Sequence, residues 1–250
     1  MTAPTVETVL VPAGRVTLND RRTQRSRLVD IAPYRLGRTQ ITRGAYAAVL
    51  GLDPPTEFAD RPVDSVSWWD VVTFCNALST QEGLSAAYDM DEIRGHAALD
   101  AAADGYRLPM AEWEHACRAG TSGPRYGDLD EVAWYRGNSG ERSHDVATKQ
   151  RNLWELHDML GNVWEWCSDL YDADVYGAYR VLRGGGWFDE HWSCRASVGG
   201  AATPASGSTT SASASHVASG LDGKVIHRSK LSSPRGGSDG SSGRHRFGPC

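Results

Sequence analysis

The sequence predicts an α+β domain in which irregular loops exceed regular elements, and three observations support this class. Residues 1–60 contain short apolar segments separated by Pro and Gly, two later segments repeat apolar residues at helical spacing, and residues 121–198 are rich in Trp, Gly and Asn without a helical period. All nine Trp lie between Trp68 and Trp192. Large aromatic side chains are therefore expected to form the core of the irregular region.

Strands are expected first along the chain. Pro12, Gly14 and Pro33 punctuate apolar-rich segments at residues 6–11, 15–18 and 34–42, which is a strand-and-turn pattern. Further on, residues 161–166 and 180–187 are also strand-like. Alternation in the first of these is expected to place Trp164 and Trp166 on one face and Val163 and Glu165 on the other.

Two helices are expected between these strand regions. Ser67 is a candidate N-cap, and after it apolar residues recur at helical spacing until the polar residues 79–83. The second helix opens near Pro109 and ends at Gly120. Each helix carries a Cys on its apolar face, Cys75 and Cys117, and both are interpreted as small buried residues rather than metal ligands.

The composition is that of an ordinary soluble globular protein. The 250 residues include 26 basic and 31 acidic side chains, with 40% hydrophobic residues and a formal net charge of -5. No run approaches the roughly 20 apolar residues of a membrane helix, and the first residues lack a signal-peptide pattern. We therefore expect a cytoplasmic, monomeric protein with no membrane partner. Its five Cys, an odd set without CxxC spacing, are expected to be free thiols.

A change of composition after Val198 divides the chain in two. Residues 199–250 are mostly Ser, Gly, Ala and Thr and hold six Lys or Arg and two Asp, so their charge is +4 and that of residues 1–198 is -9. We expect residues 1–198 to form the folded domain and residues 199–250 to be a disordered tail. Because the domain is acidic, nucleic acid is not an expected partner.

Several short motifs, in their order along the chain, resemble the formylglycine-generating enzyme (sulfatase-modifying factor) family over residues 10–198. They are VPAG at residues 11–14, QIT at 40–42 with Tyr46, RPV at 61–63, VSW at 66–68, GYRLP at 105–109, EWE at 112–114, DMLGNVWEW at 158–166 and RGGGW at 183–187. The resemblance implies a C-type-lectin-like α+β fold. One departure is Glu155, which stands where the family has Gly; if that position has a positive φ, the side chain adds strain of about 1 kcal/mol.

The resemblance also implies what chemistry to look for. Sulfatase activators of this family oxidise a Cys to formylglycine with oxygen and a copper(I) ion, which two Cys hold five residues apart after the RGG motif. The matching positions here are Asp189 and Cys194. Copper(I) prefers two thiolates, whereas a carboxylate is a hard ligand, so copper is not expected and the chain is not expected to be a standard sulfatase activator.

Two classes of function remain open. If the chain is an enzyme, it is a metal-dependent oxidoreductase acting on a thiol or cysteine-containing substrate. In that case Cys194 is the thiolate ligand or nucleophile, His191 the proton carrier or second ligand, and Asp189 orients one of them. The alternative is a non-catalytic module that binds a peptide or small molecule through its Trp-rich surface.

The family's structural calcium ion maps onto Asp158, Gly161, Val163 and Glu165. A hard ion takes backbone carbonyls and carboxylates, so these residue types suit calcium. The other interpretation of the same residues is a polar turn capped by Glu165 without a metal ion.

The tail departs from the family, whose last strand reads approximately GFR(L/V)A. Residues 199–250 contain no such motif, but assigning GC-rich codons to residues 199–218 and reading one nucleotide earlier yields IDDVGFRLAR. This suggests the hypothesis that a frameshift replaced the last strand. Without that strand, we expect an unpaired sheet edge and a less stable protein.

Overall fold

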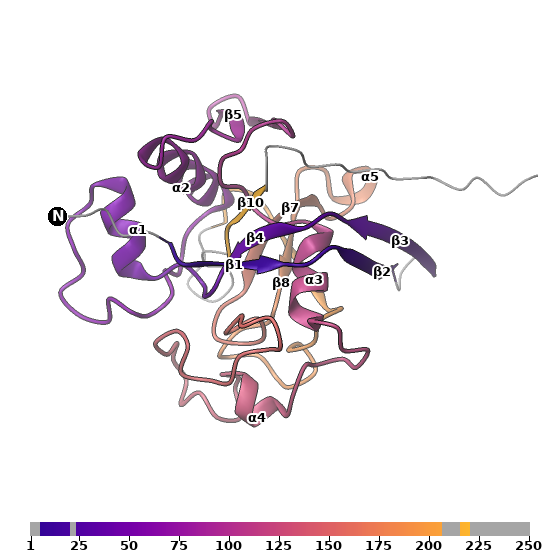
Figure 1. The fold of residues 1–250 in the computed structure, drawn as a ribbon. Helices are drawn as coiled ribbons and strands as arrows, with labels where there is room; N and C mark the ends of the chain where they lie inside the picture. Colours follow the sequence, from indigo (N-terminus) through magenta and orange to yellow (C-terminus); the bar gives the residue numbers. More distant parts are fainter. Residues whose placement is uncertain (1–5, 21–23, 207–215, 221–250) are drawn as a thin grey trace, which may run out of the picture.

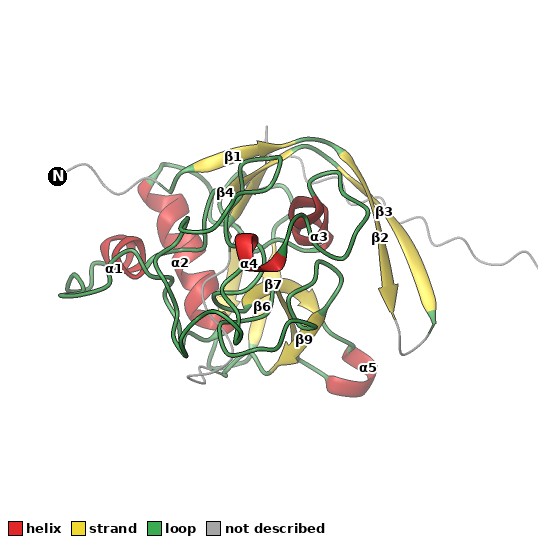
Figure 2. Cartoon of the chain, turned by 90° about the horizontal axis from the view of Figure 1, so that it is seen from below, coloured by secondary structure: helices red, strands yellow, loops and turns green. Residues whose placement is uncertain are grey.

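The computed structural model describes residues 6–20, 24–206 and 216–220. In this part of the chain, short strands form four small sheets, with strand orders β1-β4-β10, β2-β3, β5-β6 and β7-β8-β9. Loops make up much of the face seen in Figure 2. The predicted class, an α+β fold with little regular structure, is confirmed.

The N-terminal region forms two antiparallel pairs of strands, with the β2–β3 hairpin extending to one side of the molecule and helices α1 and α2 lying on the other (Figure 1). The elements are β1 (Thr8–Val11), β2 (Gly14–Asp20), β3 (Arg25–Ile31) and β4 (Tyr34–Gly37). The three predicted strands are present, although the third ends at Gly37. Among the described side chains of the unpredicted strand β3, only Val29 and Ile31 are buried, and Leu28 is exposed, so the strand has no clear apolar alternation.

The two predicted helices are α2 (Trp68–Gln81) and α3 (Ala111–Arg118). Ser67 caps α2 in a capping box with Asp70, as its position before the apolar repeat predicts. Helix α1 (Arg43–Leu50) was not predicted, because it buries only Ala47 and Val49 and shows no apolar period. The other short elements are β5 (Tyr88–Asp91), β6 (His96–Leu99), α4 (Leu129–Val132) and α5 (Ala173–Tyr176).

Two hydrophobic clusters form the core. One surrounds α3 and includes Trp113, and the other surrounds α2 and includes Trp68 and Trp166. Within residues 121–198, Trp166 is the one Trp that is buried, beside fully buried aliphatic residues such as Leu156 and Leu160, so the expected aromatic core of this region is confirmed only in part. The four Cys in the described residues are buried free thiols, as expected, and Cys250 lies outside those residues. No helix in the described part is long and apolar enough to cross a membrane.

The fourth sheet consists of β7 (Glu165–Leu170), β8 (Arg180–Arg183) and β9 (Gly199–Ala202). The predicted start of this strand at residue 161 is wrong, because the strand begins only at Glu165. Gly161 and Asn162 have φ values of 75° and 57°, which turn the chain before the strand starts. The side chains still alternate, since Glu165 contacts Trp113 of α3 whereas Trp164 and Trp166 belong to the hydrophobic cluster around α2.

The predicted end of the folded domain at Val198 is also wrong. Strand β9 pairs with β8 in the fourth sheet, and β10 (Ala218–Gly220) pairs with β4. Ala218 exchanges two backbone hydrogen bonds with Arg107, with N–O distances of 2.8 and 2.7 Å. The edge that we expected to be unpaired is therefore covered. Residues 207–215 and 221–250, on which the rest of the tail prediction falls, lie outside the described part of the chain, and the frameshift hypothesis stays a prediction.

The backbone of β10 provides a test of its contribution. Ala218→Pro removes the N–H that donates to Arg107, and we expect it to lower the free energy of unfolding by about 3 kcal/mol. Ala218→Gly keeps the N–H and should cost only about 1 kcal/mol. Urea denaturation of the two variants measures the difference. Equal stability of both variants and the wild type would show that β10 does not contribute to the fold.

The residue expected to be strained is indeed in the left-handed region, since Glu155 has a φ of 66°. Its carboxylate forms ion pairs with Arg38 and Arg151. Glu155→Ala and Glu155→Gly both lose these pairs, but only Gly adopts the conformation without strain. We expect the Gly variant to be more stable than the Ala variant by about 1 kcal/mol in chemical denaturation. An Ala variant of equal or greater stability contradicts this assignment of strain.

Candidate functional site

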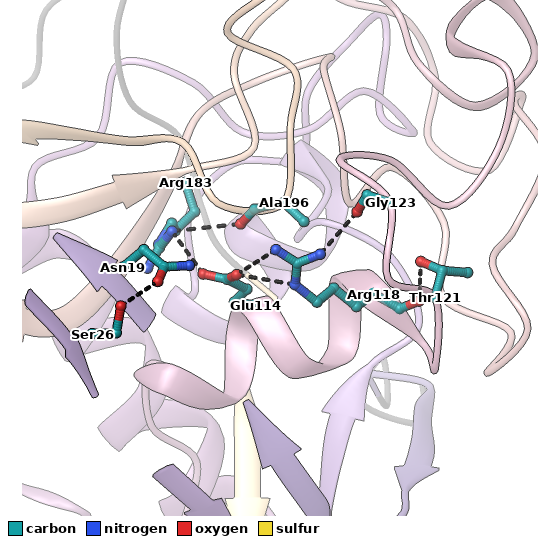
Figure 3. A network of polar contacts seen from close by, with 8 residues as sticks. All are labelled: Asn19, Ser26, Glu114, Arg118, Thr121, Gly123, Arg183 and Ala196. Carbon is teal, nitrogen blue, oxygen red and sulfur yellow. Dashed lines mark hydrogen bonds and ion pairs between the residues drawn. The ribbon is translucent and has the colours of Figure 1, made fainter. Parts of the chain in front are cut away.

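A buried ion network holds the strand that leads into the candidate site. Glu114 of α3 lies between Arg118, whose Nη2 is 2.7 Å from Glu114 Oε1, and Arg183 of β8, whose Nη1 is 3.4 Å from Oε2 (Figure 3). Arg183 Nη1 also lies 3.4 Å from the carbonyl oxygen of Ala196. These contacts fix the end of β8 against α3 and against the loop that carries the candidate residues.

Glycines then bring the backbone close to Cys194. Gly184 and Gly185 have φ values of 92° and 80°, a region that favours Gly. A Cβ atom at Gly185 would lie 2.9 Å from Cys194 Sγ. The close approach explains why this turn requires a residue without a side chain.

Asp189 is half-buried, and its carboxylate serves the local structure. Its Oδ2 accepts hydrogen bonds from Trp164 Nε1 at 2.6 Å and from the backbone N–H of Gly186 at 2.8 Å. Burial raises the pKa of Asp189, although these two donors favour the ionised form. The carboxylate thereby connects the residues before β7 to the turn after β8.

Cys194 is fully buried, and its thiol is held in the neutral form. Burial and the negative charge of Asp189 raise its pKa to about 12, against a smaller opposing effect of Arg125. Arg125 also donates to the backbone carbonyls of Cys194, at 3.0 Å, and of His191. It therefore secures the loop without making the thiol reactive.

The three candidate catalytic residues lie in the loop after β8, and their side chains have different surroundings. Asp189 accepts from Trp164 and Gly186, and its charge contributes to the raised pKa of Cys194, whereas the exposed ring of His191 packs edge-on against Trp192, with ring centroids 4.9 Å apart. Among the described residues, no group of three or more His, Cys, Asp or Glu side chains is arranged to hold a metal ion. The predicted roles of His191 as proton carrier or second ligand stay predictions.

Three of the four residues predicted to bind calcium, Asp158, Val163 and Glu165, form a second, buried cluster, whereas the backbone N–H of Gly161 donates to Gly184. Gln40 reaches into it: its Nε2 lies 2.9 Å from the Val163 carbonyl oxygen and 3.2 Å from Glu165 Oε1. Glu165 Oε2 accepts from Trp113 Nε1 at 3.0 Å. Asp158 Oδ2 accepts from the backbone N–H of Ala147 at 2.7 Å, and burial raises the pKa of this carboxyl.

His216 is the residue of this cluster that sequence analysis missed. It is fully buried, and its Nδ1 lies 2.9 Å from Glu165 Oε2. Burial alone would lower the pKa of His216, but the charge and hydrogen bond of Glu165 raise it above the usual value. Its position in a Ser-rich segment concealed it. The signal that could have pointed to His216 is Glu165. Its buried carboxylate needs hydrogen-bond partners, and residues 1–198 supply only some of them.

Comparison with protein families identifies the chain. The sequence model of the sulfatase-modifying factor enzyme 1-like domain matches residues 1–211. The chain belongs to the sulfatase-modifying factor family. The match extends beyond Val198, in agreement with strand β9.

The relatives of this family domain have diverse names. The chain is 30% identical over 199 residues to a protein named chaperone protein LppX from Paenibacillus barcinonensis, covering 64% of this chain and 71% of that one. It is 37% identical over 114 residues to the formylglycine-generating enzyme of Streptomyces coelicolor, covering 33% and 36%. A bovine protein named inactive C-alpha-formylglycine-generating enzyme 2 is 36% identical over 101 residues, covering 34% and 33%. The match therefore spans about a third of the last two relatives.

Solved structures show the same fold. Treponema denticola variable protein 1 has a TM-score of 0.75 and 27% identity, with 88% of this chain and 98% of that one covered. CarF has a TM-score of 0.70 and 25% identity, with 87% and 99% covered. The predicted C-type-lectin-like fold of the family is confirmed by this likeness over nearly the whole of both structures.

The environment of Cys194 predicts low reactivity. With a pKa of about 12, only about one thiol in ten thousand is ionised at pH 8, compared with roughly one in four for an exposed Cys. We expect iodoacetamide at pH 8 to leave Cys194 unmodified in the native protein and to alkylate it in urea. Peptide mass spectrometry at timed intervals measures both rates. Similar rates in the two conditions contradict the buried, protonated thiol.

Proposed function

We propose that this chain is a sulfatase-modifying factor family protein without the two-cysteine copper site, and that it does not act as a standard sulfatase activator. The observation that carries the proposal is the role of Asp189. Its carboxylate oxygen accepts hydrogen bonds from Trp164 and Gly186, at the position where the family resemblance implies a copper-binding thiolate. A hard oxygen ligand engaged in this way is a poor partner for copper(I).

The protonation of Cys194 supports the same proposal. A copper(I) ligand must be a thiolate, and the surroundings of Cys194 oppose its ionisation through burial and through Asp189. One thiol that ionises with difficulty, next to a carboxylate, does not reproduce the near-linear pair of thiolates that copper(I) prefers.

The second candidate is a non-catalytic module that binds a peptide or small molecule. Trp192 is 55% exposed, and the half-buried rings of Trp187 and Phe188, a few residues earlier in the chain, are in edge contact with each other. Exposed aromatic side chains are common anchors in binding sites. We propose that such a module acts in the cytoplasm as a monomer, without a nucleic-acid or membrane partner.

Copper(I) titration tests the proposal. We expect the wild-type protein to bind copper(I) no more tightly than Cys194→Ser, and to consume no oxygen with a cysteine-containing sulfatase peptide. Asp189→Cys restores the second thiol and should increase copper affinity by at least about a hundredfold over Asp189→Asn. Asp189→Asn is the matched control, since it also removes the carboxylate.

Two outcomes contradict the proposal. Tight copper binding by the wild type that Cys194→Ser abolishes, with oxygen consumption, makes the chain an oxidase with an unusual ligand pair. Equal and weak affinity in Asp189→Cys, Asp189→Asn and the wild type, with all three folded, shows that residue 189 does not decide copper binding.

A further inference from the structure

The buried carboxylate of Glu165 is already enclosed by hydrogen-bond donors. Gln40 Nε2 lies 3.2 Å from Oε1, and Trp113 Nε1 lies 3.0 Å from Oε2. His216 contributes its backbone N–H at 3.1 Å and its ring Nδ1 at 2.9 Å, both to Oε2. An ionised carboxylate has about four lone-pair sites. Three of these N–H groups fill Oε2, and the fourth leaves Oε1 with one further acceptor site, so Glu165 has little free capacity with which to bind a cation.

The carbonyl oxygens of the same cluster point at the amide of Gln40. Its Nε2 lies 2.9 Å from the Val163 oxygen and 3.2 Å from the backbone oxygen of Asp158. Gln40 is fully buried, so this amide is not exchanged for water. Oxygen atoms of three of the residues implied to bind calcium, Asp158, Val163 and Glu165, therefore surround Gln40 Nε2.

These residues, as arranged, do not fit calcium. Calcium takes six to eight oxygen ligands, about 2.3–2.6 Å from the ion. Of the buried side-chain oxygens here, Asp158 Oδ1 and Gln40 Oε1 have no hydrogen-bond partner. The backbone oxygens of Asp158 and Val163, which a calcium ion could otherwise use, accept from the Gln40 amide. The oxygens that are left are too few for the six to eight ligands of calcium.

His216 places both its ring and its backbone N–H against the buried carboxylate. Its Nδ1 faces Glu165 Oε2, and its Nε2 lies 3.1 Å from the backbone oxygen of His157. The backbone oxygen of the next residue, Val217, accepts from Gly37 N–H at 2.9 Å, which anchors the segment to β4.

We propose that the amide of Gln40 and the ring of His216 take the place of the calcium ion that the family resemblance implies, so that this domain folds and keeps its stability without calcium. The segment of His216–Gly220 then has a defined role, because it brings hydrogen-bonding groups to Glu165 as well as pairing with β4. This inference concerns the scaffold and does not rest on the proposed function.

The first test is made on the full-length wild-type protein. We expect its melting temperature to agree within about 1 °C in millimolar calcium chloride and in EGTA. Terbium(III) titration, with excitation of Trp, should give no sensitised luminescence that calcium displaces, although the Trp113 indole touches Glu165. A calcium-dependent increase in melting temperature that Glu165→Gln abolishes would overturn the proposal.

The second test attempts to create calcium dependence. Gln40→Glu removes the amide donor and places a second carboxylate beside Glu165, where like charges repel. We expect this variant to melt at a lower temperature in EGTA and to gain at least about 5 °C from calcium. Gln40→Met removes the donor without adding charge, and Gln81→Glu adds a charge elsewhere. Neither control should respond to calcium.

The variant results also decide between the alternatives. A folded Gln40→Glu that is indifferent to calcium overturns the assignment of the Gln40 amide to the cation position. If that variant does not fold in either condition, the wild-type terbium titration decides, because displaceable sensitised luminescence that Glu165→Gln removes overturns the proposal and its absence supports it.

Discussion

The structure depends on the neutralisation of one buried carboxylate. Glu165 is fully buried at the start of β7, where an uncompensated charge would cost several kcal/mol. Its donors come from the segment before α1, from α3 and from the segment before β10. One side chain therefore links regions that are more than a hundred residues apart in sequence. Loss of any donor leaves part of the charge unpaired. A substitution of one donor is therefore expected to need a compensating change in another of these segments.

The motifs that identify the family do similar structural work elsewhere. Arg107 and Glu112 form a buried pair with an N–O distance of 2.6 Å, and Tyr34 donates to the backbone oxygen of Glu112 at 2.7 Å. Glu114 pairs with Arg118 and Arg183, as described above. In a domain with few regular elements, such buried polar contacts fix the relative positions of chain segments, which long strands and helices fix in other folds. These motifs report on the scaffold and not on the reaction.

Sequence patterns predicted the elements in which local chemistry and tertiary packing agree. The capping box of Ser67 and the apolar repeat of α2 both favour a helix there, and the Gly184–Gly185 turn requires a positive φ. Helix α1 and strand β3 were missed because few of their residues are buried. Strand β10 was missed for a different reason: its short side chains are typical of disordered segments, and only the empty edge of β4 makes them a strand. At the candidate site, the proximity of Asp189 to Cys194 followed from the motif, whereas the contacts of Gln40 and His216 with Glu165 join residues that no local pattern relates.

The separation of scaffold and site explains how one family can include proteins with such different names. A family assignment rests on residues such as Arg107, Glu112 and Gly185, which fix the fold whatever occupies position 189. Under the proposed function, an exchange of Cys for Asp at that position costs little, because Trp164 and the Gly186 N–H provide donors for the carboxylate. The same exchange would remove a soft ligand for copper(I). Selection for stability could then keep every diagnostic motif while the metal chemistry changes, so we expect the residue at position 189 to say more about activity than the motifs around it do.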